Sequence, residues 1–199
     1  MSVRDHVSTG QVSWPHDVQF FDSDDTRQDA VAAFLADAYR SGSALIVIAR
    51  PLNSEGIVAR LEQRGIPMAS EIASGRITVL DAQDTLKRIS RTGSPAVAPF
   101  DEIVGGLVRR VSRHGRVCAY GEMVDLLAQR GDFFDVARLE DLWNRLASRM
   151  ELSLLCGYSA AHFVTPGTTE ALHAICGAHA SIRVQADDPL ASWLLQQAQ

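Results

Sequence analysis

The residue most suggestive of chemistry is an acid at the end of a short apolar run. Residues 117–122 read VCAYGE, so Glu122 directly follows a segment typical of a buried strand. In nucleotide-hydrolysing α/β proteins a side chain at such a position orients the attacking water or accepts its proton. Whether Glu122 has that function depends on whether the chain also holds the phosphates.

The parts of a phosphate-binding loop are absent from the sequence. Such a loop follows a strand and reads G-x-x-x-x-G-K-[ST], because its backbone amides and its lysine hold the phosphates. No segment matches, and the single lysine, Lys87, lies outside any glycine-rich loop. The turn after the first expected strand reads FDSDD, and its aspartates would repel an anion at the start of the next helix. We therefore expect no catalytic residues, no enzymatic activity and no cofactor.

The cysteines and histidines give weak signals for a metal. Three cysteines at irregular spacing do not form a disulfide framework. Cys118 and Cys156 lie inside apolar runs, where a thiol behaves as a small hydrophobe. His173, Cys176 and His179 share one helix end and could hold an ion, but they lack the second cysteine pair of common structural zinc sites. The sequence favours no metal site.

Composition and charge exclude several classes of protein. The net charge is -5 and the isoelectric point is about 5.6, and no basic stripe with interleaved aromatic residues is present, so nucleic-acid binding is not expected. No apolar run approaches the ~20 residues that cross a bilayer. The N-terminus lacks the apolar core of a signal peptide. These features predict a cytoplasmic protein without membrane contact.

Apolar patterning predicts strands and helices that alternate along the chain. Residues 92–99 (TGSPAVAP) are expected to be a flexible loop. Helices are expected between Asp22 and Gly42, between Pro51 and Gly65, and over 83–90, 100–111, 123–131, 135–149 and 167–178. Strands are expected at 16–21, 43–50, 76–82, 117–122 and 152–158. This order predicts an α/β fold of three layers, α/β/α, with a mostly parallel central sheet of about five or more strands.

In such sheets ligands bind beyond the carboxyl ends of the strands. The candidate ligand-binding residues lie at these ends, at the start of the first strand, or on the 135–149 helix. They are His16, Phe21, Asp22, Arg50, Tyr120, Glu122, Trp143 and Tyr158.

Several of these residues have a structural alternative. Glu122 either anchors a ligand, or accepts a hydrogen bond from His16, or serves as an acid at the start of the helix near 123. Tyr120 and Tyr158 either point their hydroxyls at a ligand or pack in the core with bonded tips. Trp143 shares a helix face with leucines, so it either packs in the core or contacts the ligand.

Seven segments, in order, resemble the MEDS domain, a sensory module named for methanogens, methylotrophs and a dichloromethane-responsive regulator. The resemblance spans about residues 16 to 179. The segments are HDVQFFD (16–22), ALIVIARP (44–51), LEQRGI (61–66), RITVLDAQDTL (76–86), RVCAYGEMV (116–124), RLEDLWNRL (138–146) and SLLCGY (153–158). The resemblance implies a RecA/KaiC-like fold without a working phosphate loop. It also implies sensing of small molecules, hydrocarbon derivatives among them.

The resemblance sets the expected organisation and function. We expect a flexible leader at 1–15, a sensory domain at 16–180 and a C-terminal segment at 181–199 that forms a short helix. The domain would bind a small molecule at the rim of the sheet and signal in trans to a histidine kinase or transcriptional regulator. Two alternatives remain open. One is a degenerate nucleotide binder without hydrolysis, and the other is an interaction module in which residues 188–198 dock a kinase or a second copy, giving a homodimer.

Overall fold

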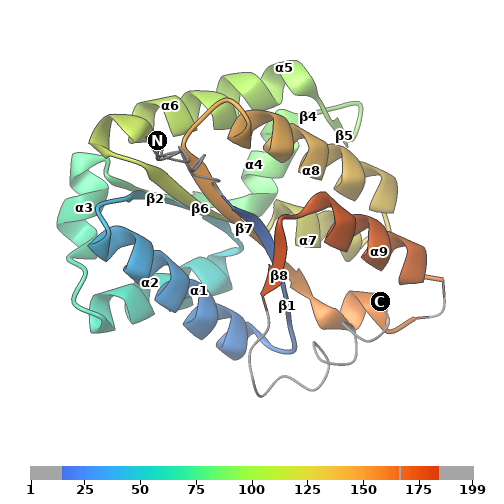
Figure 1. Ribbon diagram of the computed structural model, residues 1–199, viewed down its shortest axis with the longest axis horizontal. Helices are drawn as coiled ribbons and strands as arrows, with labels where there is room; N and C mark the ends of the chain where they lie inside the picture. The colour runs from blue at the N-terminus through green and yellow to red at the C-terminus, as the bar shows by residue number, and fades with distance from the viewer. Residues whose placement is uncertain (1–14, 166, 184–199) are drawn as a thin grey trace, which may run out of the picture.

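The computed structural model describes residues 15–165 and 167–183. Within these ranges the main sheet has six strands, all parallel, in the order β3-β2-β6-β7-β1-β8 (Figure 1). The strands are β1 (His16–Phe21), β2 (Ala44–Ala49), β3 (Ile77–Asp81), β6 (Val117–Gly121), β7 (Leu152–Ser159) and β8 (Ser181–Arg183).

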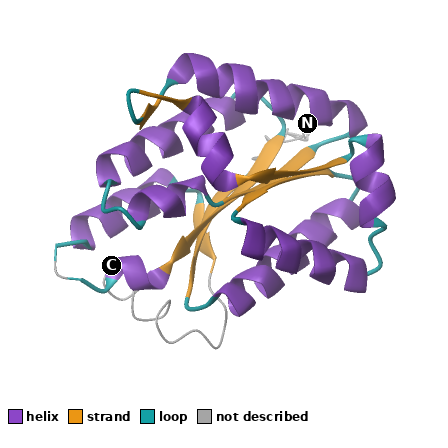
Figure 2. Cartoon of the chain, turned by 180° about the vertical axis from the view of Figure 1, so that it is seen from behind, coloured by secondary structure: helices purple, strands orange, loops and turns teal. Residues whose placement is uncertain are grey.

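Helices cover both faces of this sheet, as Figure 2 shows from the opposite side. One face is covered by α1 (Asp24–Arg40), α2 (Pro51–Gln63) and α3 (Met68–Ser74). The other face is covered by α4 (Ala82–Ile89), α5 (Val97–Phe100), α6 (Gly106–Val111), α7 (Met123–Ala128), α8 (Phe133–Ala147) and α9 (Thr169–Ala178). A π-turn, η1 (Asp101–Gly105), joins α5 to α6, and 3-10 turns lie at η2 (Ser112–His114) and η3 (Ala160–Phe163). The predicted three-layer α/β/α fold is confirmed.

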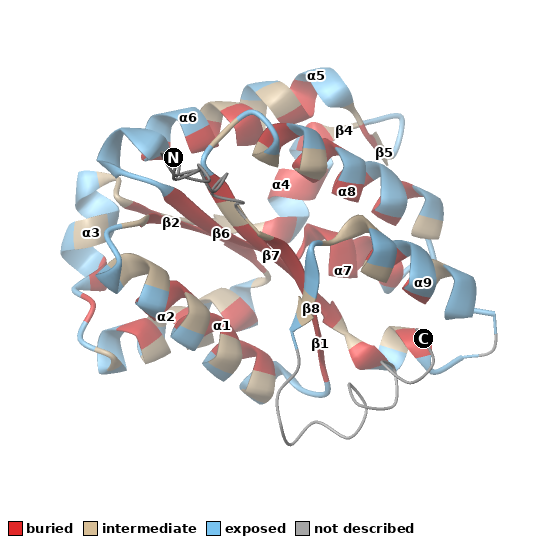
Figure 3. Ribbon diagram, viewed as in Figure 1, coloured by how far each residue is buried: buried red, intermediate tan, exposed pale blue. Residues whose placement is uncertain are grey.

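The central strands are buried on both sides, as their continuous apolar runs predict (Figure 3). In β2, Leu45 and Val47 pack towards α1 to α3, whereas Ile46 and Ile48 pack towards the opposite helices. Two hydrophobic cores therefore lie back to back, with the sheet between them.

The link between β1 and α1 consists of two residues, Asp22 and Ser23. Ser23 caps α1: its side chain accepts a hydrogen bond from the backbone N–H of Thr26, and the Thr26 hydroxyl accepts one from the Ser23 N–H. This link is too short for the loop that cradles phosphates in P-loop proteins.

Residues 92–99 differ from the expected loop. Strands β4 (Ser90–Arg91) and β5 (Ser94–Pro95) form a small antiparallel hairpin, and α5 begins at Val97. The turn places Thr92 and Gly93 at positive φ angles of 50° and 95°, a conformation that glycine adopts without steric cost.

Strand β8 was not predicted from the sequence. It pairs with β1 in the segment that we expected to form a C-terminal helix, and its three residues are too few to show a strand pattern. Residues 1–14 of the expected leader and residues 184–199 of the segment expected to form a C-terminal helix lie outside the described residues. Among the helices that the structure describes, none combines the length and apolar character needed to span a bilayer.

Candidate functional site

A cavity of about 350 Å³ opens at the carboxyl ends of β1, β2 and β7. It includes three of the residues that the sequence suggested as ligand-binding: Phe21, Asp22 and Arg50. The full lining is Phe21, Asp22, Ser23, Asp24, Arg27, Arg50, Leu52, Asn53, Asp125, Gln129, Ser159 and His162. We call this the rim cavity.

Glu122 lies directly behind the rim cavity and is fully buried. Its Oε1 accepts hydrogen bonds from Arg27 Nη1 at 2.8 Å, from Arg50 Nη2 at 3.0 Å and from Asn53 Nδ2 at 2.5 Å. Its Oε2 accepts one from the backbone N–H of Arg50 at 2.7 Å. Glu122 precedes α7, but its side chain makes no capping bond there. Its carboxylate therefore anchors the floor of the cavity and does not serve as a helix acid.

Asp125 is the second buried acid of this site. Its Oδ1 accepts a hydrogen bond from the backbone N–H of Ser159 at 2.6 Å and lies 3.2 Å from His162 Nε2. Its Oδ2 lies 3.5 Å from Arg27 Nη2 and also contacts Arg50. Two arginines and two carboxylates thus form one closed network, which we call the rim network.

The rim network shifts the pKa values of Arg27 and Asp125 towards their charged forms. Burial alone would lower the pKa of Arg27, but Tyr120, Asp125 and Glu122 raise it above its usual value. Burial alone would raise the pKa of Asp125, but His162, Arg27, the Ser159 N–H and Arg50 hold it below its usual value. Because the paired charges are already satisfied, a ligand must exchange with them to bind strongly.

The lowered pKa of Asp125 predicts a pH dependence of stability. A carboxyl whose folded-state pKa is depressed stabilises the fold fully above its unfolded-state value of 3.8, and this contribution is lost as the pH falls through the lower folded value. We expect the free energy of unfolding of Asp125→Asn to fall less steeply than that of the wild type below pH 3.8. Denaturant titrations at several acidic pH values measure these slopes.

Asp141→Asn is the matched control, because Asp141 is 57% exposed and pairs only with Arg145 on the same helix. Its acid slope should equal that of the wild type. If the acid slope of Asp125→Asn equalled the slopes of the wild type and of Asp141→Asn, the rim network would not lower the pKa of Asp125.

The two tyrosines among the candidate residues are core residues with bonded tips. Tyr120 is fully buried on the α1 side, where its hydroxyl accepts a hydrogen bond from Arg27 Nη1 at 3.4 Å. Tyr158 is fully buried on the opposite side and donates to Glu140 Oε1 at 2.5 Å. Neither lines the rim cavity, although Tyr120 supports it through Arg27.

Trp143 also lies away from the cavity. It is 1% exposed and packs edge-on against Phe100, with their ring centroids 5.2 Å apart. The structure therefore supports the interpretation that Trp143 packs in the core.

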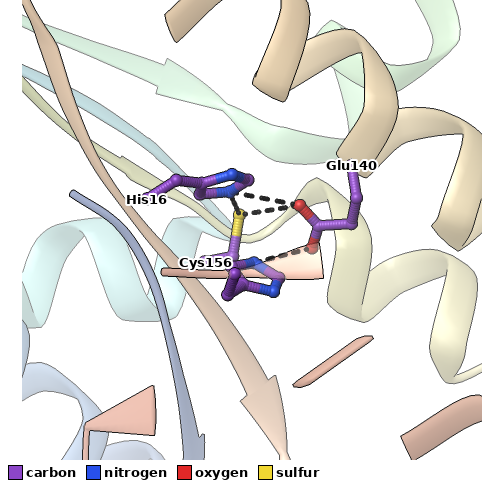
Figure 4. A group of neighbouring side chains, drawn as sticks. His16, Glu140 and Cys156 are labelled. Atoms are coloured by element: carbon purple, nitrogen blue, oxygen red, sulfur yellow. Dashed lines mark hydrogen bonds and ion pairs between the residues drawn. The ribbon is translucent and has the colours of Figure 1, made fainter. Parts of the chain in front are cut away.

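The bond between His16 and Glu122, one of the alternatives that the sequence left open, is not formed. His16 begins β1, at the opposite end of the strand from the rim cavity, and it joins a second buried group with Glu140, Cys156 and His179 (Figure 4). His16 Nε2 lies 3.2 Å from Glu140 Oε2 and 3.3 Å from Cys156 Sγ. His179 Nε2 lies 3.4 Å from Glu140 Oε1. We call these four residues the His16 cluster.

Glu140 is the centre of this cluster. Burial alone would raise its pKa, but His179 and His16 hold the pKa well below its usual range. Burial and the same carboxylate raise the pKa of the Cys156 thiol and of the Tyr158 hydroxyl well above their usual values. The cluster is thus a buried anion faced by two imidazoles, a thiol and a phenol.

The likeness to a solved structure supports the fold. A KaiC-like protein from the hyperthermophilic archaeon Pyrococcus horikoshii OT3 superposes with a TM-score of 0.51 at 14% sequence identity. The superposition covers 74% of this chain and 64% of that protein, so this chain spans less than two thirds of the length of its structural neighbour. No curated protein matches the sequence.

A family model is matched over most of the chain. The model describes the MEDS domain, the methanogen/methylotroph, DcmR sensory domain, and the match covers residues 15–179. These residues include the rim network, the whole His16 cluster and five strands of the main sheet, β1, β2, β3, β6 and β7. The KaiC-like fold that the resemblance implied is present in the structure. The chain therefore belongs to the MEDS family of sensory domains.

Proposed function

We propose that this MEDS domain is a non-catalytic sensor that binds a small hydrocarbon derivative with a polar head group in the rim cavity. The occupied domain signals in trans to a partner such as a histidine kinase or a transcriptional regulator. The observation that carries the proposal is a cavity of about 350 Å³ at the carboxyl ends of parallel strands, floored by the buried rim network.

The lining of the rim cavity defines the chemistry of the ligand. Among the described residues that line the cavity, Phe21 and Leu52 are the apolar ones, and the others carry charges, hydroxyls, amides or an imidazole. A bare hydrocarbon would leave these polar groups without partners, which costs free energy. A short chain against Phe21 and Leu52, with a hydroxyl or carboxylate towards Arg50, satisfies both parts of the lining.

Arg50 is the most exposed member of the rim network. Its side chain is 26% exposed, whereas Glu122 and Asp125, to which it is paired, are fully buried. An anionic or hydroxyl head group that binds Arg50 loosens the bond to Asp125. Arg50 directly precedes α2 and Asp125 lies in α7, so a change in this pairing shifts the balance between two arrangements of these helices. The shift requires that the ligand binds one arrangement more tightly than the other.

Nucleotide binding has less support from the same cavity. Asp22 and Asp24 lie on the β1–α1 side of the lining, where a phosphate would meet negative charge. The docking alternative that uses residues 188–198 lies outside the described residues.

The proposal is tested by two-dimensional NMR of the full chain with methanol, formate, methylamine, dichloromethane and ATP with Mg²⁺ as separate probes. We expect the probes that carry a hydroxyl or a carboxylate, methanol and formate, to shift the backbone amide resonances of Arg50, Asp125 and Ser159. Arg50→Met should abolish the shift. Arg64→Met is the matched control, because Arg64 is also 26% exposed and paired to an aspartate but does not line the cavity.

Shifts by ATP with Mg²⁺ alone would replace this proposal with the nucleotide-binding alternative. A response that survives in Arg50→Met, or is lost equally in Arg64→Met, would place the ligand elsewhere. No response to any probe would leave the docking alternative as the better account of the domain.

A further inference from the structure

The His16 cluster combines four potential metal ligands of three types, two imidazoles, a carboxylate and a thiol, from four elements of the fold. His16 comes from β1, Glu140 from α8, Cys156 from β7 and His179 from the end of α9. The potential ligand atoms all lie within 4.8 Å of one another. We propose a binding site for a divalent transition metal, Zn²⁺ foremost, formed by His16, Glu140, Cys156 and His179.

The spacing of the ligand atoms fits a tetrahedral ion. With metal–ligand bonds of about 2.0–2.3 Å, neighbouring ligand atoms of a tetrahedral zinc site lie about 3.3–3.8 Å apart. The cluster shows 3.2 Å from His16 Nε2 to Glu140 Oε2, 3.3 Å from His16 Nε2 to Cys156 Sγ and 3.4 Å from Cys156 Sγ to Glu140 Oε2. These three atoms already form one face of such a tetrahedron.

The hydrogen bonds around His16 turn its Nε2 into the cluster. Asn144 Nδ2 donates to the carbonyl of Ala178 at 3.1 Å, which fixes the orientation of the amide. Asn144 Oδ1 must then accept from His16 Nδ1, 2.8 Å away. Nδ1 therefore carries a proton, and Nε2 faces Glu140 Oε2 and Cys156 Sγ, so a metal ion at this place would replace its contacts with them. Metal-binding histidines are commonly oriented by such a bond from their second nitrogen.

His179 shows the same arrangement independently. Its Nδ1 lies 2.6 Å from the carbonyl oxygen of Ile175, so this nitrogen carries the proton. Its side chain is fully buried, and its Nε2 has no hydrogen-bond partner although it points at Glu140, 3.4 Å away. Its pairing with Glu140 is an ion pair without a well-formed hydrogen bond, and a buried polar atom that lacks a hydrogen bond costs free energy. A cation between the two imidazoles and the carboxylate removes this cost.

The carboxylate of Glu140 is also held from outside the ligand set. Tyr158 donates to its Oε1 at 2.5 Å, and carboxylates that bind metals are commonly oriented by such a hydrogen bond. A cavity of about 70 Å³ between α8 and α9 includes Glu140 in its walls, which gives the side chain room to adjust around an ion. A thiolate and two imidazoles favour Zn²⁺ over Mg²⁺ or Ca²⁺, which prefer oxygen ligands.

The site differs from the one that the sequence suggested. Of His173, Cys176 and His179, only His179 belongs to the cluster. Cys176 lies one helical turn before His179 and is therefore a natural control residue.

The test uses the full chain, stripped with a chelator and then reconstituted with Zn²⁺ or Co²⁺ alone. We expect about one zinc per chain, and a thiolate-to-cobalt charge-transfer absorption in the cobalt form. Cys156→Ser should lose this absorption, and Cys176→Ser should keep it. Asn144→Ala, which leaves all four ligands in place, should weaken zinc binding about 10–100-fold.

A folded wild-type chain that binds no zinc and shows no charge-transfer absorption overturns the proposal and leaves a hydrogen-bonded core cluster. The proposal is also overturned if Cys176→Ser loses the charge-transfer absorption and Cys156→Ser keeps it. If Cys156→Ser does not fold, the Asn144→Ala affinity decides: an unchanged affinity contradicts the site. None of these measurements requires a sensory ligand, so they are independent of the rim cavity.

Discussion

Arg27→Met is expected to destabilise the protein by about 3–5 kcal/mol, the cost of removing one partner from a buried ion pair. Arg27 is 2% exposed and lies between two carboxylates that are themselves fully buried. Without its guanidinium, Arg50 is the one arginine of the rim network left to pair with Glu122 and Asp125, and Tyr120 loses the donor to its hydroxyl. Denaturant unfolding of the variant and the wild type at neutral pH measures the difference.

Arg40→Met is the control for the loss of an arginine from the same helix. Arg40 is 55% exposed and pairs with Asp37 one turn earlier, so its removal should cost no more than about 0.5 kcal/mol. Arg27→Lys should also destabilise, because a lysine ammonium cannot reach two carboxylates with the fork of a guanidinium.

A double-mutant cycle separates the charge from the packing. Adding Glu122→Gln to Arg27→Met removes one of the two acids that lost their ion pair with Arg27, so the double variant should be more stable than the sum of the single losses by about 0.5–3 kcal/mol. Strictly additive losses, or a cost for Arg27→Met no larger than that of Arg40→Met, would show that the rim network does not stabilise the fold.

The sequence predicted the rim because the carboxyl ends of parallel strands meet at one edge of a sheet. Phe21, Asp22 and Arg50 follow recognisable strands, and the structure brings all three to one cavity with Glu122 beneath it. The carboxyl end of a strand can be located from a single apolar segment of the sequence, because it does not depend on which strands are neighbours. The residues at that end can therefore be inferred to lie at the ligand-binding edge.

The partners of Glu122 could not be predicted in the same way. Arg27 stands among polar residues at the start of α1 and resembles an exposed helix residue. Asp125 carried a signal that the sequence analysis did not use: it is an acid within the apolar run MVDLLA, and a helix buried on that face must give its charge a partner.

The His16 cluster depends on strand register, which the sequence does not show. His16 pairs with Leu154 across the sheet, so its side chain shares a face with Cys156, 140 residues away. A register different by one residue would place the two side chains on opposite faces. The likeness of the sequence to a family gave the fold, but the meeting of residues so far apart follows only from the paired strands.

The buried position of Trp143 favours core packing over ligand contact, so the loss of its side chain should have a large effect on stability. Trp143→Ala is expected to destabilise the protein by about 3–5 kcal/mol, because it leaves a cavity where the indole packs against Phe100 and the β6–β7 part of the sheet. A pocket residue would behave differently: its truncation would leave the free energy of unfolding nearly unchanged and would remove the response to ligand.

Trp143→Phe separates volume from the polar group. The indole Nε1 is buried without a hydrogen-bond partner, so its removal sacrifices no bond and lifts a desolvation cost. The phenylalanine variant should therefore retain most of the stability that the alanine variant loses, and both should keep the chemical shifts of Arg50 and Ser159 at the rim.

Equal losses in the two variants would indicate an unseen partner of Nε1, such as a bound water, and near-wild-type stability of Trp143→Ala would contradict its place in the core. Because Trp143 packs against Phe100 and makes no hydrogen bond or ion pair with Arg27, Arg50, Glu122 or Asp125, these two outcomes are independent of the Arg27 cycle.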